Sequence, residues 1–321
     1  MNMPVIDFAG FLSGDPAAKS ATAEAINRAC RETGFFMLSN HGLDEAVIDT
    51  AFRMAANFFD LPTQEKKNLS IEKSAYHRGW YGHGDEVLDG ERQPEGDLKE
   101  GLKIGRDLSP DHPMVKAQTP LHGPNQWPAD ITFKTSMQEA YAACETLSHR
   151  LMRAFALSLG LAEDHFKPLL TLPMATLSPI RYPPVQRAHD KERPLGAGAH
   201  TDFGCLTLLL QRDEAGLEIE LPDGEWLSVP CAPNHVTVNI GDMMARWTNN
   251  LYASTRHRVI NKGDGLRHSM AFFFDPDADA DLSPLPGCLK DGETAKFPSA
   301  TCLSHLLAKI DESFSYRKGA I

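Results

Sequence analysis

Apolar positions in the first 60 residues switch between strand-like and helix-like spacing. We expect a short strand over 5–8 and a helix over 19–33 that ends at Gly34, because glycine commonly terminates helices. A buried strand is expected over 35–38. Asp44 can then cap a helix whose apolar positions share one face, namely Ile48, Ala51, Phe52, Ala55, Phe58 and Phe59. The beginning of the chain is therefore expected to be α/β.

The middle of the chain contains two segments that differ in composition and in the spacing of apolar residues. Residues 74–130 are rich in glycine, proline, histidine and charge, which predicts loops with short elements. A long helix is expected next, because apolar residues recur every three or four positions up to Gly160. These residues are Phe133, Met137, Tyr141, Cys144, Leu147, Leu151 and Phe155. Such a stripe needs a surface to cover, and a sheet is the natural one.

From about residue 174 the pattern predicts short strands. They are expected over 205–210, 217–221, 235–240, 255–260 and 266–274, with turn residues such as Gly241-Asp242 between them. Strands at this spacing without intervening helices indicate a sandwich or barrel. A last helix is expected over 302–314. We therefore predict a mainly β protein with flanking helices, in which an N-terminal α/β region (1–120) and a core with the long helix (121–321) form one structural unit.

Composition and charge narrow the class of protein. The 321 residues are 42% hydrophobic and 23% charged, which suits a globular chain with a substantial core. The formal net charge of −11 argues against a nucleic-acid partner. A small anionic substrate stays compatible with this charge, because a few local cations can override it. A chain of this size can function as a monomer.

The expected compartment is the cytoplasm. No run of about 18 apolar residues is present, so we expect no membrane partner. The N-terminus lacks the basic flank and apolar stretch of a secretory signal. The cysteines form no C-x-x-C pair and are expected to be thiols in a reducing compartment. They are Cys30, Cys144, Cys205, Cys231, Cys288 and Cys302.

Candidate metal ligands lie in the strand-rich half. His200-Thr201-Asp202 is expected to open a strand, where residues two apart project to the same side and can bind one ion. His257 lies on a later predicted strand. Two imidazoles and one carboxylate form the facial triad that leaves three positions open on ferrous iron. An isolated H-x-D pair is usually a surface or capping feature, so the hypothesis needs further support.

That support comes from the next strand. Arg267, Ser269 and Ala271 share one face of it. A guanidinium and a hydroxyl that point into a barrel are costly unless an anionic group meets them. The distal carboxylate of a dicarboxylate cosubstrate would be such a group.

Longer strings resemble a known family. HTDFGCLTLL, GDMMARWTNNLYASTRHRVIN and RHS together resemble the isopenicillin N synthase-like branch of the iron(II)/2-oxoglutarate dioxygenases. MPVIDF, RETGFFMLSNHGL, GPNQWP and RYPP extend the resemblance over nearly the whole chain. The resemblance implies a double-stranded β-helix, or jelly roll, flanked by helices.

The resemblance also implies roles for particular residues. His200, Asp202 and His257 match the family's iron ligands. Arg267 and Ser269 match the pair that usually binds the C5 carboxylate of 2-oxoglutarate, and Tyr182 matches a tyrosine that assists. Many plant members carry asparagine two residues before that tyrosine, where this chain has Ile180.

The implied activity is oxidation of a small molecule by dioxygen, with ferrous iron as cofactor, 2-oxoglutarate as cosubstrate, and release of succinate and carbon dioxide. Hydroxylation, desaturation and cyclisation stay open as outcomes. So do an isopenicillin N synthase-type oxidase without 2-oxoglutarate, an ethylene-forming enzyme and a non-catalytic binding protein.

Several further residues have both a functional and a structural interpretation. Residues 76–81 either line the substrate entrance or form an ordinary loop. The segment Asp97-Leu98-Lys99-Glu100 is expected to be structural, as are Trp247 and Tyr252. Phe203 and Leu208 flank the triad and are expected to pack in the core.

Overall fold

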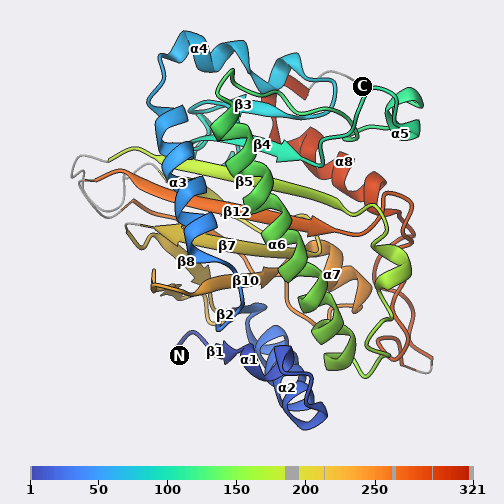
Figure 1. Cartoon of the computed structure of the whole chain (residues 1–321). Helices are drawn as coiled ribbons and strands as arrows, with labels where there is room; N and C mark the ends of the chain where they lie inside the picture. The colour runs from blue at the N-terminus through green and yellow to red at the C-terminus, as the bar shows by residue number, and fades with distance from the viewer. Residues whose placement is uncertain (1, 185–194, 213, 262–264, 291, 318–321) are drawn as a thin grey trace.

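The fold consists of two β-sheets with helices packed on the larger one (Figure 1). The computed structural model describes residues 2–184, 195–212, 214–261, 265–290 and 292–317. The larger sheet contains, in spatial order, β1 (Val5–Asp7), β2 (Phe35–Ser39), β10 (Val236–Ile240), β7 (Leu206–Arg212), β12 (Arg267–Asp275), β5 (Met174–Tyr182), β4 (Glu100–Gly105) and β3 (Gly79–Tyr81). The smaller contains β6 (Ala197–His200), β11 (His257–Val259), β8 (Leu217–Glu220) and β9 (Trp226–Ser228). β1 and β2 are parallel, whereas the other paired strands run antiparallel.

Two long helices cross the outer face of the larger sheet. They are α3 (Glu45–Phe59) and α6 (Ile131–Ser158), which pack on β5 and β12 and run beside each other (Figure 1). The other helices are α1 (Ala9–Leu12), α2 (Pro16–Glu32), α4 (Thr63–Asn68), α5 (Pro113–Lys116), α7 (Asp242–Trp247) and α8 (Cys302–Ser313). Short 3-10 turns span Ile71–Lys73, Lys167–Leu169 and Ser315–Arg317. The main apolar core lies between these helices and the sheet.

The predicted helices and their ends are largely confirmed. The Asp44 side chain accepts a hydrogen bond from Ala46 N at the start of α3. α2 is followed by Gly34, whose φ of +68° favours glycine. The apolar stripe of α6 is buried as expected, from Phe133 to Phe155. The jelly-roll fold class with flanking helices is confirmed as well.

Residues 74–130 consist of loops with short elements, as predicted, and one of these elements is β4, a six-residue strand buried between β5 and β3. Two local predictions were wrong. His200 ends β6, and Asp202 lies in the connection to β7 rather than in a strand. Asp242 begins helix α7 instead of forming a turn, because its backbone N–H is held by the Asp202 carbonyl at 2.8 Å. In each case a contact distant in sequence outweighs the local pattern.

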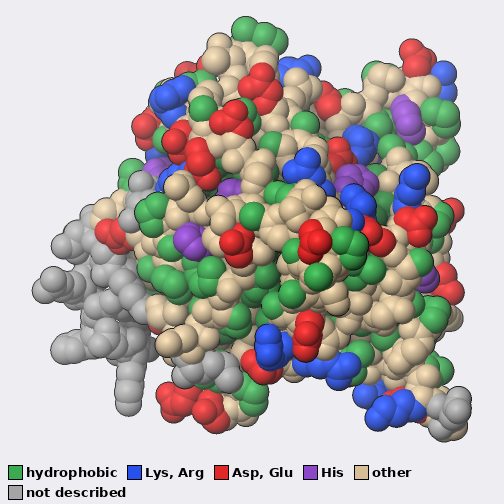
Figure 2. Space-filling model, turned by 60° about the horizontal axis from the view of Figure 1, so that its bottom comes forward, with side chains coloured by type: hydrophobic (Ala, Val, Ile, Leu, Met, Phe, Trp, Pro, Cys, Tyr) green, Lys and Arg blue, Asp and Glu red, His purple; other side chains and the backbone are tan. Residues whose placement is uncertain are grey.

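The N-terminal region is built into the larger sheet at both of its edges. It supplies β1 and β2 at one edge and β4 and β3 at the other. This arrangement is consistent with one structural unit, although the boundary at residue 120 stays a prediction. None of the described helices has the length and apolar composition needed to cross a bilayer. Acidic, basic and apolar side chains are interspersed on the face shown in Figure 2.

Candidate active site

Two histidines face each other across paired strands. His200 at the end of β6 lies directly opposite His257 at the start of β11, and their ring centroids are 4.3 Å apart. Asp202 Oδ1 lies 3.8 Å from His200 Nε2 and 3.6 Å from His257 Nε2. One ligand atom from each of the three residues lies within 4.8 Å of the others. This cluster can hold a metal ion.

Backbone carbonyls orient both imidazoles. His200 Nδ1 lies 2.7 Å from the Gly198 carbonyl oxygen, and His257 Nδ1 lies 3.1 Å from that of Thr255. A carbonyl can only accept, so each Nδ1 donates the hydrogen. Each Nε2 therefore faces Asp202, the arrangement typical of histidine metal ligands.

The two oxygens of Asp202 have different surroundings. Oδ2 accepts hydrogen bonds from Thr207 Oγ1 at 2.6 Å and from Asn239 Nδ2 at 2.7 Å. Oδ1 faces the imidazoles instead. β7 and β10 thus hold one carboxylate oxygen and leave the other for a ligand.

The electrostatics of the cluster favour a neutral His200 and an ionised Asp202. Burial lowers the pKa of His200 to about 3, and the nearby His257 adds to this effect. Burial is the largest influence on the pKa of Asp202 and raises it, but His257, His200 and the Thr207 hydrogen bond together outweigh burial, so the pKa lies below its ordinary value. For His257, burial lowers the pKa while Asp202 raises it, and the net shift is upward. An ionised carboxylate beside a neutral imidazole is the donor state that a divalent cation needs.

A buried guanidinium lies on the opposite sheet. Arg267 is 2% exposed, and its guanidinium lies over the Tyr182 ring at 4.7 Å. Its Nη2 donates to Gln211 Oε1 at 3.0 Å and its Nε to the Glu214 carbonyl at 3.2 Å. Nη1 of Arg267 and Oγ of Ser269 are buried without a partner among the described residues. Two such donors side by side on one strand fit an anionic oxygen group.

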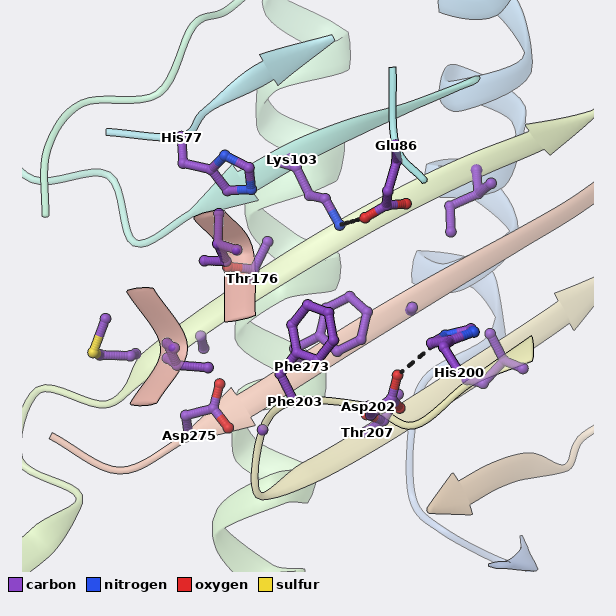
Figure 3. A pocket seen from close by; sticks show the side chains of 18 of the residues that line it. His77, Glu86, Lys103, Thr176, His200, Asp202, Phe203, Thr207, Phe273 and Asp275 are labelled. Carbon is purple, nitrogen blue, oxygen red and sulfur yellow. Dashed lines mark hydrogen bonds and ion pairs between the residues drawn. The ribbon is translucent and has the colours of Figure 1, made fainter. Parts of the chain in front are cut away.

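One cavity joins these two groups of residues. It has a volume of about 190 Å³ and lies between the two sheets. The three candidate ligands line it together with Arg267, and Figure 3 shows His200 and Asp202 at one side of it. Tyr182 and Ile180 also line it; Ile180 lies opposite Ser269 in the β5–β12 register. The apolar Ile180 therefore stands beside the unpartnered hydroxyl, where it adds no further donor.

The cavity decides between the two interpretations of residues 76–81. His77, Arg78 and Tyr81 all line it, so this segment contributes to the pocket. Phe203 lines the cavity as well and does not only pack in the core, whereas Leu208 is fully buried there.

The segment 97–100 has a mixed role. Glu100 ties Lys66, Trp80 and Arg181 together, which is the structural role expected. Lys99, in contrast, lines the cavity. Trp247 and Tyr252 are buried and hold backbone or side-chain partners, in agreement with a structural role.

Some lining residues were missed by sequence analysis. They are Glu86, Lys103, Thr207, Asn239 and Asp275, which border the cavity from different parts of the chain. Only Thr207 lies inside a string that carried the family resemblance. For the others no local pattern distinguishes a pocket residue from a surface residue.

Comparisons with known proteins identify the family. Residues 3–130 match the family described as "non-haem dioxygenase in morphine synthesis N-terminal", and residues 174–276 match the "2OG-Fe(II) oxygenase superfamily". The "2-oxoglutarate-Fe(II) type oxidoreductase hxnY" of Emericella nidulans is 36% identical over 303 residues, which cover 93% of this chain and 86% of the relative. "Clavatol oxidase claD" of Penicillium crustosum is 33% identical, with 98% and 97% covered. The crystal structure of a full-length Neurospora crassa protein in complex with alpha-KG and thymine superimposes with a TM-score of 0.85 at 30% identity, covering 97% of this chain and 96% of that one.

Fold and relatives together define a non-haem iron oxidoreductase with a double-stranded β-helix core. This chain belongs to the iron(II)/2-oxoglutarate-dependent oxygenases. Its cofactor is ferrous iron and its cosubstrate is 2-oxoglutarate. The comparisons do not favour the oxidase, ethylene-forming or non-catalytic alternatives.

Proposed function

We propose that His200, Asp202 and His257 hold the ferrous iron of this enzyme, and that Arg267 and Ser269 bind the distal carboxylate of 2-oxoglutarate. Tyr182 orients the Arg267 guanidinium by packing against it. The substrate is a small molecule that enters the same cavity. We also propose that residues 1–120 and 121–321 form one structural unit. We further propose that the protein is cytoplasmic, and this is supported by its buried free thiols, which are Cys30, Cys144, Cys205, Cys288 and Cys302.

One observation carries this proposal. Arg267 Nη1 and Ser269 Oγ are both buried and without partners among the described residues. Arg267 lines the cavity that also contains the His–Asp–His cluster, whereas Ser269 is not among its lining residues and lies two positions further along the same strand. An unpaired buried donor costs about 1–3 kcal/mol, so two adjacent ones imply that an acceptor occupies this place in the working enzyme. A dicarboxylate can reach both the metal and the guanidinium.

Neighbouring residues hold the candidate metal ligands in position, whereas the bound groups provide the chemistry. With both bound, iron and 2-oxoglutarate would activate dioxygen, which would oxidise the substrate at a C–H bond and convert 2-oxoglutarate to succinate and carbon dioxide. Thr207 and Asn239 hold the outer oxygen of Asp202, and the carbonyls of Gly198 and Thr255 fix the imidazoles. Asp202 and His257 are themselves buried, at 8% and 7% exposed.

Anaerobic titration of the iron(II)-loaded protein with 2-oxoglutarate tests the assignment. A weak visible charge-transfer band of the chelated 2-oxo acid is expected for the natural protein. Arg267→Met should weaken 2-oxoglutarate binding by at least about tenfold, because it removes the charge-assisted hydrogen bond that Nη1 can donate. Arg153→Met on the exposed side of α6 is the matched control and should leave the band unchanged.

The same experiment can contradict the proposal. Iron binding without any band would mean that the Arg267 pocket does not serve 2-oxoglutarate. Substrate-dependent oxygen uptake without a 2-oxo acid would then favour the oxidase mechanism. A band that survives unchanged in Arg267→Met would refute the role of this residue.

A further inference from the structure

The cavity has a charge that differs in sign from that of the whole chain. Five cationic side chains line it, namely Arg78, Lys99, Lys103, Arg106 and Arg267, against three acidic ones, Glu86, Asp202 and Asp275. The chain as a whole has a formal net charge of −11. Positive charge is therefore concentrated where a substrate binds.

Two of these cations are matched by carboxylates. Lys99 Nζ lies 2.7 Å from Glu86 Oε2 and 2.8 Å from Asp97 Oδ2. Arg106 pairs with Glu145. The charge of each cation is thus offset by a carboxylate, although Arg106 Nε has no hydrogen-bond partner among the described residues.

Lys103 forms a weaker ion pair than Lys99 and Arg106 do. Its Nζ lies 3.9 Å from Glu86 Oε1, and it donates no hydrogen bond to any described residue. Lys99 already holds the other oxygen of this carboxylate. The Lys103 side chain is 11% exposed, and burial lowers its pKa. A buried ammonium with unused donors is costly unless an acceptor meets it.

Aromatic rings surround the Lys103 ammonium. Its Nζ lies 5.3 Å from the Tyr81 ring centre, 5.2 Å from that of Phe273 and 5.9 Å from that of Phe314. These rings hold the ammonium at one place without supplying a hydrogen-bond acceptor. The group is thus positioned in advance for a ligand.

A second cation lies on the same side of the cavity. Arg78 donates only to the carbonyls of Leu121 (2.8 Å) and His77 (3.3 Å). Its Nε is buried without a partner, and no carboxylate pairs with its guanidinium within the described part of the chain. Arg78 therefore adds positive potential near Lys103 instead of cancelling a negative one.

Two aromatic side chains, Phe203 and Phe273, lie in the region between Lys103 and the candidate metal ligands. Figure 3 shows Lys103 and Glu86 on one side of the pocket, His200 and Asp202 on the other, and the rings of Phe203 and Phe273 in the region between them. The cavity of about 190 Å³ also has to receive 2-oxoglutarate, so a substrate that binds beside it has to be small. Ligand pockets in proteins commonly measure about 300–1,000 Å³.

We propose that Lys103 determines substrate specificity, and that the substrate is a small carboxylate with a flat, apolar body. Its carboxylate accepts hydrogen bonds from Lys103 Nζ, and its body packs on Phe203 and Phe273, which directs the oxidisable carbon toward the His–Asp–His cluster. This inference rests on the proposed function, because it takes the Arg267 end of the cavity to be filled by 2-oxoglutarate.

The test compares matched carboxylates and amides on the complete enzyme. The iron(II)-loaded protein is saturated with 2-oxoglutarate under argon, and the charge-transfer band is recorded first. Benzoate, phenylacetate and cinnamate, and the corresponding amides, are then titrated by calorimetry. At least one carboxylate should bind at least about tenfold more tightly than its amide, as expected for a charge-assisted contact.

Variants then assign the preference to Lys103. Lys103→Met keeps the length and apolar character of the side chain and should abolish the preference for carboxylates, while 2-oxoglutarate affinity stays unchanged. Lys116→Met, at an exposed position, is the control and should keep the preference.

The outcomes separate this inference from the proposed function. Amides that bind as tightly as carboxylates, a preference that survives in Lys103→Met, or a panel in which no carboxylate binds would each overturn the inference while a normal band upholds the 2-oxoglutarate site. The comparison of carboxylates with amides uses the natural protein alone, so it still tests the preference for a carboxylate if Lys103→Met fails to fold. Absence of the band itself would refute the proposed function, and this inference with it.

Discussion

The hydroxyl of Thr207 donates a 2.6 Å hydrogen bond to Oδ2 of Asp202, and this bond leaves Oδ1 facing the two imidazoles. Thr207 lies on β7, whereas Asp202 belongs to the connection that precedes this strand. A strand of the larger sheet thus orients the Asp202 carboxylate toward two histidines of the smaller sheet.

Removal of this hydroxyl should weaken metal binding without removing a ligand. Thr207→Val keeps the shape of the side chain but removes one of the two hydrogen bonds that hold Oδ2 of Asp202, so we expect iron(II) affinity to fall about 10–100-fold. Competition with a chelator gives the dissociation constant. Thr207→Ser keeps the hydroxyl and should bind iron nearly as well as the natural protein; equal loss in both variants would show that packing, not the hydrogen bond, matters.

Gly241 allows a close approach of two backbone segments behind the site, its own and the connection that contains Asp202 and Gly204. A Cβ at this position would lie 2.5 Å from the carbonyl oxygens of both Asp202 and Gly204. Gly241→Ala should therefore lower the free energy of unfolding by about 1–3 kcal/mol and also weaken iron binding. Urea unfolding measures the first effect. Gly10→Ala, where the nearest atom lies at an ordinary 3.4 Å, should cost little; equal costs at both positions would contradict the argument.

Glu100 is the buried centre of a polar network. It accepts hydrogen bonds from Lys66 Nζ at 2.7 Å, from Trp80 Nε1 at 2.9 Å and from Arg181 Nη2 at 2.7 Å. Glu100→Gln leaves the buried Lys66 without its charge partner and Arg181 with only the exposed Asp60, and should lower the free energy of unfolding by about 3–5 kcal/mol. Chemical denaturation of this variant and of the exposed Glu24→Gln measures the difference. A loss below about 1 kcal/mol for Glu100→Gln would show that the network contributes little.

Asp275 should make stability depend on pH near neutrality. Burial raises its pKa from 3.8 to about 7, a hydrogen bond from Cys205 N opposes this shift, and the charge of Asp202 adds to it. At a pH between these two pKa values, the Asp275 carboxyl therefore keeps its proton in the folded state but has lost it in the unfolded state. Linkage then requires that the contribution of this group to stability is highest below about pH 4, falls as pH rises, and levels off above about pH 7.

Asp275→Asn tests this dependence, because Oδ1 of asparagine can still accept from Cys205 N. Relative to the natural protein, the variant should gain up to about 4 kcal/mol of unfolding free energy between about pH 4 and pH 8. Urea unfolding of metal-free samples across this range provides the comparison. Parallel stability curves for the two proteins would rule out a raised pKa for Asp275.

Local pattern in the sequence was sufficient for the four longest helices, α2, α3, α6 and α8, and for most strands. α3 and α6 follow from apolar spacing and from a capping aspartate, both of which act over a few residues. The pattern was insufficient for β4, because its burial comes from β5 and β3 on either side. It was also insufficient for Asp202, whose backbone carbonyl is held by Asp242 N rather than by a strand partner.

The sequence by itself determined the chemical inventory: a His–x–Asp pair, a second histidine and an Arg–x–Ser pair, all of which the side-chain types and the family strings make recognisable. Only the tertiary structure decided how these groups meet. Pairing of β6 with β11 brings His257 opposite His200, and the order of the larger sheet places Lys103 of β4 beside the same cavity. The physical reason is that spacing along the chain sets which face a side chain occupies, whereas strand pairing and burial over long sequence distances set what that face contacts.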